Sequence, residues 1–332
     1  MAQCLLRPES DLIATGQRND AMGQYPTSLT EWSRCGLNVF QQPSMDQRPG
    51  NGQNTKEGIP LACGHRSNYG DWMGKRVSLR KSNMRVIFSR KGFDSAAGNA
   101  PSPIIDGEPI SLPIPTTRRS ETSYLIAGLG DIVEQMTKGR IGAADLCHED
   151  PMFSNGRWAF GQTGAAQSHL ERNGVGVGDV FLFFGLFSSL DGRDRHHRIF
   201  GYLEIDEVRR LGSRPSTSDS PKGFLRRHPH TIGEWNENNT LYIGAGAKAR
   251  SAHPCLRLTK AGAPVSVWTV PVWLKAAGLT YHRNPVRWAN DKELHVASRG
   301  QEFVSNIGNH AAPREWLRAM QAAIETDRCG GH

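Results

Sequence analysis

The chain has 332 residues and a formal net charge of +8, with 40 lysines and arginines against 32 aspartates and glutamates. This balance favours a polyanionic partner, nucleic acid first, although a mildly basic enzyme has a similar charge. No stretch approaches the roughly 18 apolar residues that span a bilayer, so we expect no membrane partner. The six cysteines include no C-x-x-C pair, and no secretory signal is apparent, so we expect reduced thiols and a cytoplasmic location.

Residues 1–83 show neither helical nor strand periodicity, and glycine, asparagine, glutamine, serine and proline are scattered through them. We expect little structure in this segment. Either it is a disordered extension or the functional chain starts at Met84, and the apolar run after Met84 favours the second interpretation. Residues 84–332 suffice for one sizeable core, and a single domain is the simpler expectation.

The predicted elements begin with a strand over 84–88, which ends in the polar loop 89–95. Residues 101–105 and 108–115 follow as two extended pieces joined by a tight Asp-Gly turn. Their many prolines favour edge strands, because proline cannot donate a hydrogen bond to a neighbouring strand.

Two helices and a hairpin are predicted in the middle of the chain. The helices cover 130–138 and 163–172, and a glycine follows each within two residues, which suits a helix end. Residues 180–187 form a nearly continuous apolar run, which indicates a central, buried strand. A charged loop separates this strand from 198–205, so the two form a long antiparallel hairpin.

The last third of the chain contains two more predicted strands, over 238–243 and 256–259. A proline argues against an unbroken helix over 265–274. The chain closes with a helix over 313–325, which has a proline in its first turn. Together these elements predict an α+β fold with a mostly antiparallel sheet, or a partly open barrel, and flanking helices.

The hairpin has features of small RNA-binding barrels. A Gly-Asp turn, a buried strand, a polar loop and a returning strand that contains glycine also occur in barrels of the PUA, ASCH and EVE type. Those barrels bind RNA or modified bases. Many antiparallel sheets contain such a hairpin, so the pattern does not identify the fold by itself.

Six segments together resemble a known family: Ser89–Asp94, Gly161–Leu170, Gly178–Gly185, His228–His230, Asn239–Tyr242 and Arg299–Phe303. The family is the third group of nucleotide modification associated domains, and the resemblance covers almost all of 84–332. It implies association with base-modification systems, including those of bacteria and their phages. A nucleotide, DNA or RNA ligand and partner proteins of such a system are therefore expected, whereas catalytic residues and cofactors stay unknown.

The loop after the first strand is a candidate phosphate site. Arg90 and Lys91 supply two cations, and the Ser89 hydroxyl can donate a hydrogen bond to an anion. Asp94 would orient one of the cations and is a candidate catalytic carboxylate. The alternative is a surface loop whose aspartate caps backbone amides. No G-x-x-x-x-G-K-[ST] pattern occurs, which argues against a P-loop nucleoside triphosphatase.

The helix over 163–172 and the residue before it carry further candidates. Gln162 and Gln167 have amide groups that can pair with a base edge. His169 is the candidate catalytic histidine, and a hydrogen-bonded buried role is its alternative. Helical spacing sets Gln167 and His169 on different faces, so one of them is expected to be structural.

A pair of histidines follows the hairpin. His228 and His230 would point to the same side of an extended segment, where they could contact substrate or bind a metal. His148, Glu149 and Asp150 are the residues that would complete a metal site. Because no third ligand is apparent from the sequence, we predict no metal site and assign the two histidines to substrate binding.

Three polar residues near the C-terminus are the best candidates for chemistry. Arg299 can clamp a phosphate with two hydrogen bonds, Gln301 can read a base, and Glu302 can move a proton. The alternative is a salt bridge at the entry to a helix or strand.

These residues leave two main classes of function open. In the first, the chain is an enzyme that modifies, or removes a group from, a base or nucleotide, and residues 89–94, 162–169 and 299–302 converge on one pocket. In the second, it is a PUA-like reader of modified DNA or RNA. A titratable pair in the pocket favours the enzyme, and an aromatic cage without acid or base favours the reader. The density of polar side chains leads us to prefer the modification role, whereas dispersed loops would indicate a partner protein.

Overall fold

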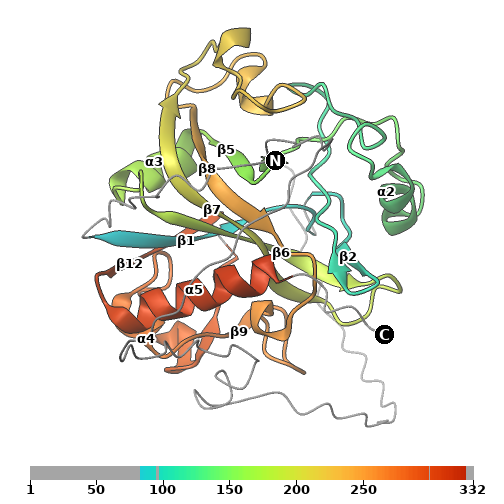
Figure 1. Cartoon of the computed structure of the whole chain (residues 1–332). Helices are drawn as coiled ribbons and strands as arrows, with labels where there is room; N and C mark the ends of the chain where they lie inside the picture. Colours follow the sequence, from blue (N-terminus) through green and yellow to red (C-terminus); the bar gives the residue numbers. More distant parts are fainter. Residues whose placement is uncertain (1–82, 95–96, 299, 327–332) are drawn as a thin grey trace, which may run out of the picture. The chain divides into compact units, whose positions relative to one another are not determined.

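The structure is a computed structural model, and it describes residues 83–94, 97–298 and 300–326 (Figure 1). All of these residues lie within one compact unit, Gly64–His332. The expectation for residues 1–83 falls, apart from Asn83, outside the described residues.

The main sheet of the described residues has nine strands: β1 Met84–Arg90, β2 Ser102–Ile105, β3 Glu108–Pro109, β4 Met152–Ser154, β5 Arg157–Gln162, β6 Val180–Ser189, β7 His196–Arg210, β8 Thr240–Lys248 and β12 Glu302–Gly308. A smaller sheet contains β9 Val267–Thr269, β10 Trp288–Asn290 and β11 Glu293–His295. The helices are α2 Gly130–Thr137, α3 Gly164–Arg172, α4 Trp273–Ala277 and α5 Ala311–Glu325. Short 3₁₀ turns are η1 Thr217–Asp219, η2 Pro229–Thr231, η3 Pro254–Leu256 and η4 Pro285–Arg287.

The strands of the main sheet run in the order β12-β1-β6-β7-β8-β5-β4; β2 also pairs with β6, and β3 pairs with β2. Neighbours along this order are antiparallel except β1 and β6, and β2 also runs parallel to β6. The sheet is therefore mixed, mostly antiparallel and open. The predicted α+β class is confirmed at this level, and the PUA-like identity stays a prediction.

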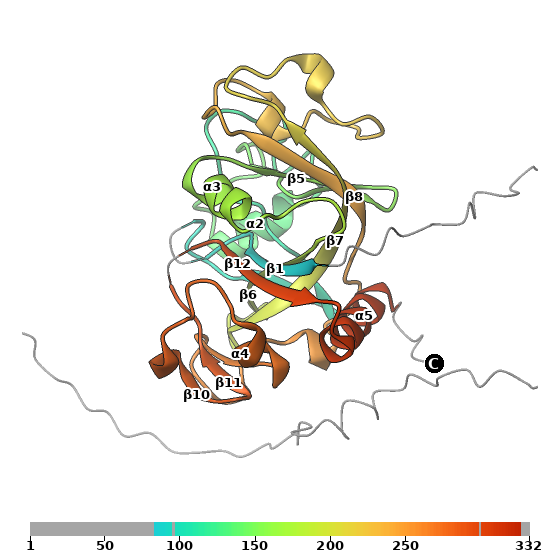
Figure 2. The ribbon, with the colours of Figure 1, turned by 90° about the vertical axis from the view of Figure 1, so that its left-hand side faces the viewer.

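Both faces of the central strands are covered, which explains why the predicted strand over 180–187 is apolar without alternation. Phe184 of β6 belongs to a buried cluster with Leu317 of α5. Its neighbour Phe183 points to the opposite face and belongs to a second cluster with Leu170 of α3. Figure 2 shows α3 and α5 on opposite sides of β1.

The main sheet is strongly curled. Trp158 of β5 stacks on Phe183 of β6 with ring centroids 5.3 Å apart, although three strand spacings, roughly 14 Å, would separate these strands in a flat sheet. β7 and β8 approach each other closely at Gly244, where a Cβ would lie 1.8 Å from the Glu204 carbonyl oxygen. The curl brings the end of β5 towards β12, at the far end of the strand order.

Most local predictions are confirmed. The strands over 84–88 and 180–187 and the helices over 130–138 and 163–172 are present within one or two residues. The strand predicted over 256–259 is wrong, since η3 and isolated bridges occupy that region. The sequence analysis also missed β5, whose five C-terminal residues are all buried. Within the described residues, no helix is both long and apolar enough to cross a membrane.

His282 ties two loops of the C-terminal part together. Its ring is 1 % exposed, donates from Nδ1 to the Thr280 carbonyl (2.8 Å) and accepts at Nε2 from the Ala297 N–H (2.9 Å). Burial, which outweighs the contact with Thr280, lowers the pKa of His282 from 6.5 to about 4. A proton on Nε2 would also break the bond from Ala297. The neutral ring therefore holds this junction.

Acid is expected to weaken the fold through His282. Because the unfolded chain takes up the proton first, the stability that this ring contributes above pH 6.5 is lost as the pH falls towards about 4. The full loss is about 3 kcal/mol. Denaturant unfolding between pH 7 and 4 should show a shallower pH dependence for His282→Gln than for the wild type. His295→Gln, at an exposed ring, is the control, and an unchanged slope in His282→Gln would contradict this account.

Candidate functional site

A cleft of about 1100 Å³ opens beside the C-terminal ends of β1 and β5. Six residues of the predicted site line it: Arg90, Lys91, Asp94, Gln162, His230 and Gln301. The sequence analysis did not place five other lining residues at the site: Arg118, Arg119, His148, Asp150 and Trp235. The cleft is thus assembled from segments that lie far apart in the chain.

Glu302 does not itself line the cleft, but it hydrogen-bonds to two residues that do, and it is 1 % exposed. Its Oε1 accepts hydrogen bonds from Lys91 Nζ (3.1 Å) and from Gln162 Nε2 (2.7 Å). Its Oε2 is buried and has no hydrogen-bond partner within the described part of the chain. Ser89 pairs with Glu302 across β1 and β12, and its buried hydroxyl is likewise without a partner there. A fixed, buried carboxylate with one oxygen unpartnered among the described residues therefore lies behind Lys91 and Gln162 of the cleft.

The two cations of the first loop already have protein partners. Arg90 Nη2 donates to the Ala297 carbonyl (3.2 Å), and its guanidinium lies 5.7 Å from the Phe184 ring centroid. Burial, opposed by Asp94, lowers the pKa of Arg90. Lys91 Nζ lies 4.2 Å from the Phe160 ring centroid as well as beside Glu302. Their phosphate-binding role stays a prediction.

Asp94 caps a backbone amide, as expected if the segment after β1 is an ordinary surface loop. Its Oδ1 accepts a hydrogen bond of 2.7 Å from the Ala97 N–H, as an aspartate does when it caps a turn. The residue also lines the cleft, and its catalytic role stays a prediction.

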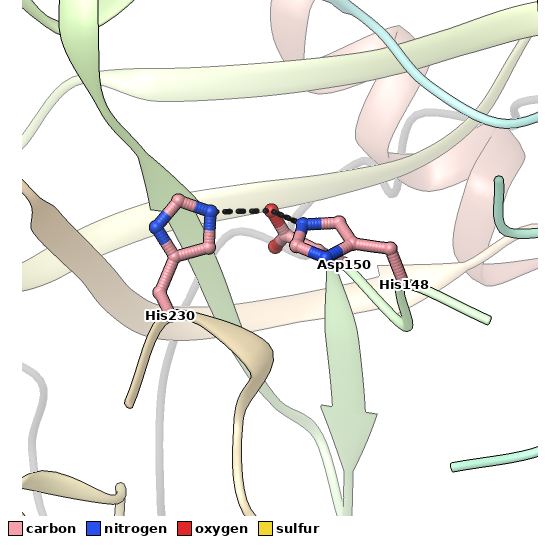
Figure 3. Close-up of side chains that lie close together, drawn as sticks. All are labelled: His148, Asp150 and His230. Atoms are coloured by element: carbon pink, nitrogen blue, oxygen red, sulfur yellow. Dashed lines mark ion pairs between the residues drawn. The ribbon is translucent and has the colours of Figure 1, made fainter. Parts of the chain in front are cut away.

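Three histidines surround Asp150, which lies on the loop before β4. Figure 3 shows two of them, His148 and His230. Asp150 Oδ1 accepts hydrogen bonds from the Gly161 N–H (3.0 Å) and from His228 Nε2 (3.2 Å). Its Oδ2 faces His148 Nε2 at 3.7 Å and His230 Nε2 at 3.6 Å, both longer than a hydrogen bond. The carboxylate is thus anchored by one oxygen and presents the other to two imidazoles.

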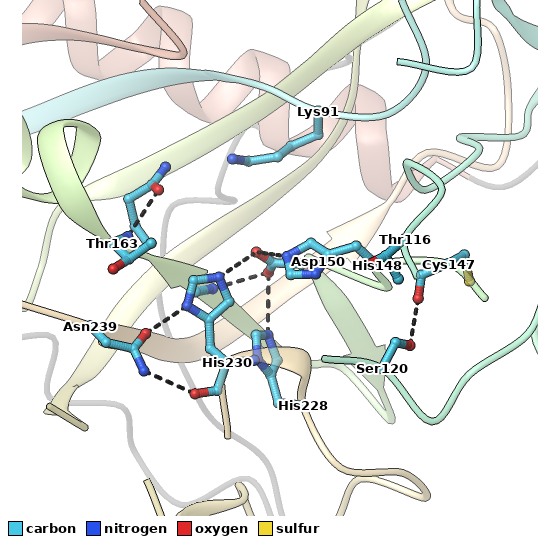
Figure 4. A network of polar contacts seen from close by, with 12 residues as sticks. Lys91, Thr116, Ser120, Cys147, His148, Asp150, Thr163, His228, His230 and Asn239 are labelled. Atoms are coloured by element: carbon cyan, nitrogen blue, oxygen red, sulfur yellow. Dashed lines mark hydrogen bonds and ion pairs between the residues drawn. The ribbon is translucent and has the colours of Figure 1, made fainter. Parts of the chain in front are cut away.

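Hydrogen bonds fix the orientation of the rings (Figure 4). His230 Nδ1 lies 2.7 Å from Asn239 Oδ1, and Asn239 Nδ2 donates to the His230 carbonyl (2.9 Å), so Nδ1 is the donor and Nε2 carries the lone pair. His228 Nδ1 accepts from the His230 N–H (3.2 Å), which leaves its Nε2 to donate to Asp150. His228 and His230 therefore each have one defined tautomer when neutral.

Burial and mutual contacts together set the charges of His230 and Asp150. It lowers the pKa of His230 to about 3, so the ring is neutral near pH 7. Burial alone would raise the pKa of Asp150, but its contacts with the histidines outweigh burial and hold that pKa well below its usual range. Trp235 stacks on His230 with ring centroids 4.1 Å apart, and the Arg119 guanidinium lies 4.4 Å from the Trp235 centroid.

A family model described as nucleotide modification associated domain 3 matches residues 85–306. The chain belongs to this family. Membership in this family connects the chain with nucleotide modification. The matched range contains all of the cleft residues named above. Neither a search of curated proteins nor a search of solved structures gave a match.

Five of the described residues predicted for the site do not line the cleft of the nucleotide modification associated domain: Ser89 and Glu302, described above, and Gln167, His169 and His228. Gln167 accepts a hydrogen bond from the Tyr242 hydroxyl in the core (3.1 Å). His169 Nε2 lies 3.1 Å from Thr280 Oγ1, because α3 turns it towards that loop. His228 is fully buried behind Asp150, and Arg299 lies outside the described residues.

Proposed function

We propose that this nucleotide modification associated domain is an enzyme that modifies, or removes a group from, a nucleotide base bound in the cleft. The observation that carries the proposal is the convergence of the loop after β1, the end of β5 and the segment before β12 on one cleft. Asp150, whose side chain is 5 % exposed, lines this cleft, and the buried Glu302 is hydrogen-bonded to its lining residues Lys91 and Gln162. Concave sites that combine fixed titratable groups with polar side chains are the usual location of catalysis.

The residues divide into a reacting group and a binding group. Glu302 is the proposed general acid or base, since Lys91 and Gln162 fix one oxygen and the other has no hydrogen-bond partner among the described residues. Arg118 and Arg119 are exposed on the rim and would attract the phosphate. The exposed Gln301 would contact the base edge.

The composition of the cleft favours an enzyme over a reader. Among the described lining residues Trp235 is the one tryptophan, tyrosine or phenylalanine, and one aromatic ring does not form a cage. His148, Asp150 and His230 instead provide titratable groups on the wall. The second candidate, a PUA-like reader, is supported by the mostly antiparallel sheet and by the cationic rim.

The test is mass spectrometry of nucleosides from cells with and without the full chain. DNA, RNA and free nucleotide pools are digested separately, so the fraction that changes identifies the substrate class. A nucleoside that appears or disappears with the protein supports the enzyme, and its mass identifies the group. An unchanged profile in all three fractions contradicts the proposal, and binding to modified oligonucleotides across a salt series would then test the reader.

A further inference from the structure

We propose that His148, Asp150 and His230 bind one first-row transition metal ion on the wall of the cleft. This inference goes beyond the proposed function, because metal binding can be measured with no nucleotide present. The sequence analysis predicted no metal site, since the third ligand is not evident along the chain. The fold supplies it by placing the loop at 148–150 against η2.

The distances between the three ligand atoms suit a shared ion. Asp150 Oδ2, His148 Nε2 and His230 Nε2 all lie within 4.8 Å of one another, and the carboxylate oxygen is 3.7 and 3.6 Å from the two nitrogens. Tetrahedral ligands at ordinary bond lengths are about 3.3–3.6 Å apart. Only small movements would therefore bring the three atoms onto one ion (Figure 3).

The hydrogen bonds around these atoms leave two acceptors facing each other. Asn239 takes the proton of His230 Nδ1, so Nε2 of the neutral ring presents a lone pair to Asp150 Oδ2. Two acceptors 3.6 Å apart repel each other unless a cation lies between them. A metal ion satisfies both and also engages His148.

Outer contacts hold two of the ligands in place before any ion binds. Asn239 orients His230, and His228 with the Gly161 N–H anchors Asp150. Gly161 also makes room for the ring, because a Cβ there would lie 2.3 Å from atoms of the His230 ring. Partners of this kind around the ligands are typical of protein metal centres.

The ligand set indicates the kind of metal. Two imidazoles and one carboxylate bind Zn²⁺, Fe²⁺ and related ions, whereas Mg²⁺ and Ca²⁺ prefer oxygen ligands. All three residues line the cleft, so the remaining coordination positions face the space proposed for the nucleotide. There the ion would polarise a bound water or a substrate oxygen.

The experiment uses the full chain, freed of metal by chelation and dialysis and then titrated with Co²⁺ and with Zn²⁺. We expect one equivalent bound by equilibrium dialysis and a visible Co²⁺ absorption band that Zn²⁺ displaces. Asp150→Asn and His230→Gln should each weaken binding by about 100-fold or more. His295→Gln, at an exposed ring outside the cleft, should bind as the wild type does.

Two results would overturn the proposal: no stoichiometric binding by the wild type, or unchanged binding in both Asp150→Asn and His230→Gln. His148→Gln keeps the test decisive if either of those variants fails to fold, because Asp150 retains its bonds to His228 and Gly161. Circular dichroism checks each fold. Since no nucleotide is present, a failure here leaves the proposed enzyme untouched, and an unchanged nucleoside profile leaves the metal site untouched.

Discussion

Replacing Lys91 by methionine is expected to lower the free energy of unfolding by about 3–5 kcal/mol. The side chains of Lys91 and Glu302 are 11 % and 1 % exposed, and their charged atoms lie 3.1 Å apart. Methionine fills similar space against Phe160 but leaves the Glu302 carboxylate buried without its cation. An uncompensated buried charge is far more costly than a lost surface ion pair.

Denaturant unfolding measures this effect, and the chain offers a matched control. Lys275 Nζ lies 2.9 Å from Asp291 Oδ1, but the two side chains are 41 % and 66 % exposed. Lys275→Met should therefore cost less than about 1 kcal/mol. Adding Glu302→Gln to Lys91→Met should recover stability, because the unpaired charge is removed. Equal losses in the two lysine variants would show that the buried pair has no special role.

Glu302→Gln is expected to slow the nucleoside change by about 100- to 10,000-fold, the usual contribution of a general acid or base. Glutamine keeps the shape of the side chain and an oxygen that can accept from Lys91 and Gln162. Unlike glutamate, it cannot take up and release a proton at the position of Oε2. The loss should thus appear in the rate, followed by mass spectrometry, with the fold retained.

Ser305→Ala is the control for disturbance of β12. Ser305 lies on the same strand, is fully buried and pairs with Val86 of β1. Its hydroxyl has no hydrogen-bond partner among the described residues, whereas Glu302 bonds to Lys91 and Gln162 of the cleft. A wild-type rate in this variant together with a large loss in Glu302→Gln would assign the effect to the carboxylate. A wild-type rate in Glu302→Gln would remove Glu302 from the proposed reaction.

The parts of the fold that sequence patterns predicted are those set by neighbouring residues. The apolar run over 180–187 requires burial on both faces, and the structure has clusters on both. The Asp106-Gly107 turn is present because both residues adopt positive φ, +48° and +77°, as the tight hairpin turn requires. β5 was missed because its burial comes from the curl of the sheet rather than from a local alternation.

The site was less predictable because its contacts span long distances in the chain. Lys91 and Glu302 are separated by 211 residues, and Asp150 and His228 by 78. Residue type predicted a cation at Lys91, but only the packed sheet shows that this cation is paired with a carboxylate. Likewise, the sequence offered His148, Glu149 and Asp150 as possible further ligands, but only the fold shows that His148 and Asp150 lie beside His230 of η2.

The residues around Glu302 and the arginines on the rim of the cleft are held by different parts of the fold. Lys91, Gln162 and Glu302 stand at or beside the ends of strands in one hydrogen-bonded sheet, whereas Arg118 and Arg119 belong to a loop outside the sheet. Loops tolerate substitutions better than the strands of a sheet do. Substitutions in the rim loop are therefore expected to change which ligand the cleft accepts while the sheet stays intact, whereas substitutions that remove the contacts among Lys91, Gln162 and Glu302 are expected to disturb the sheet itself.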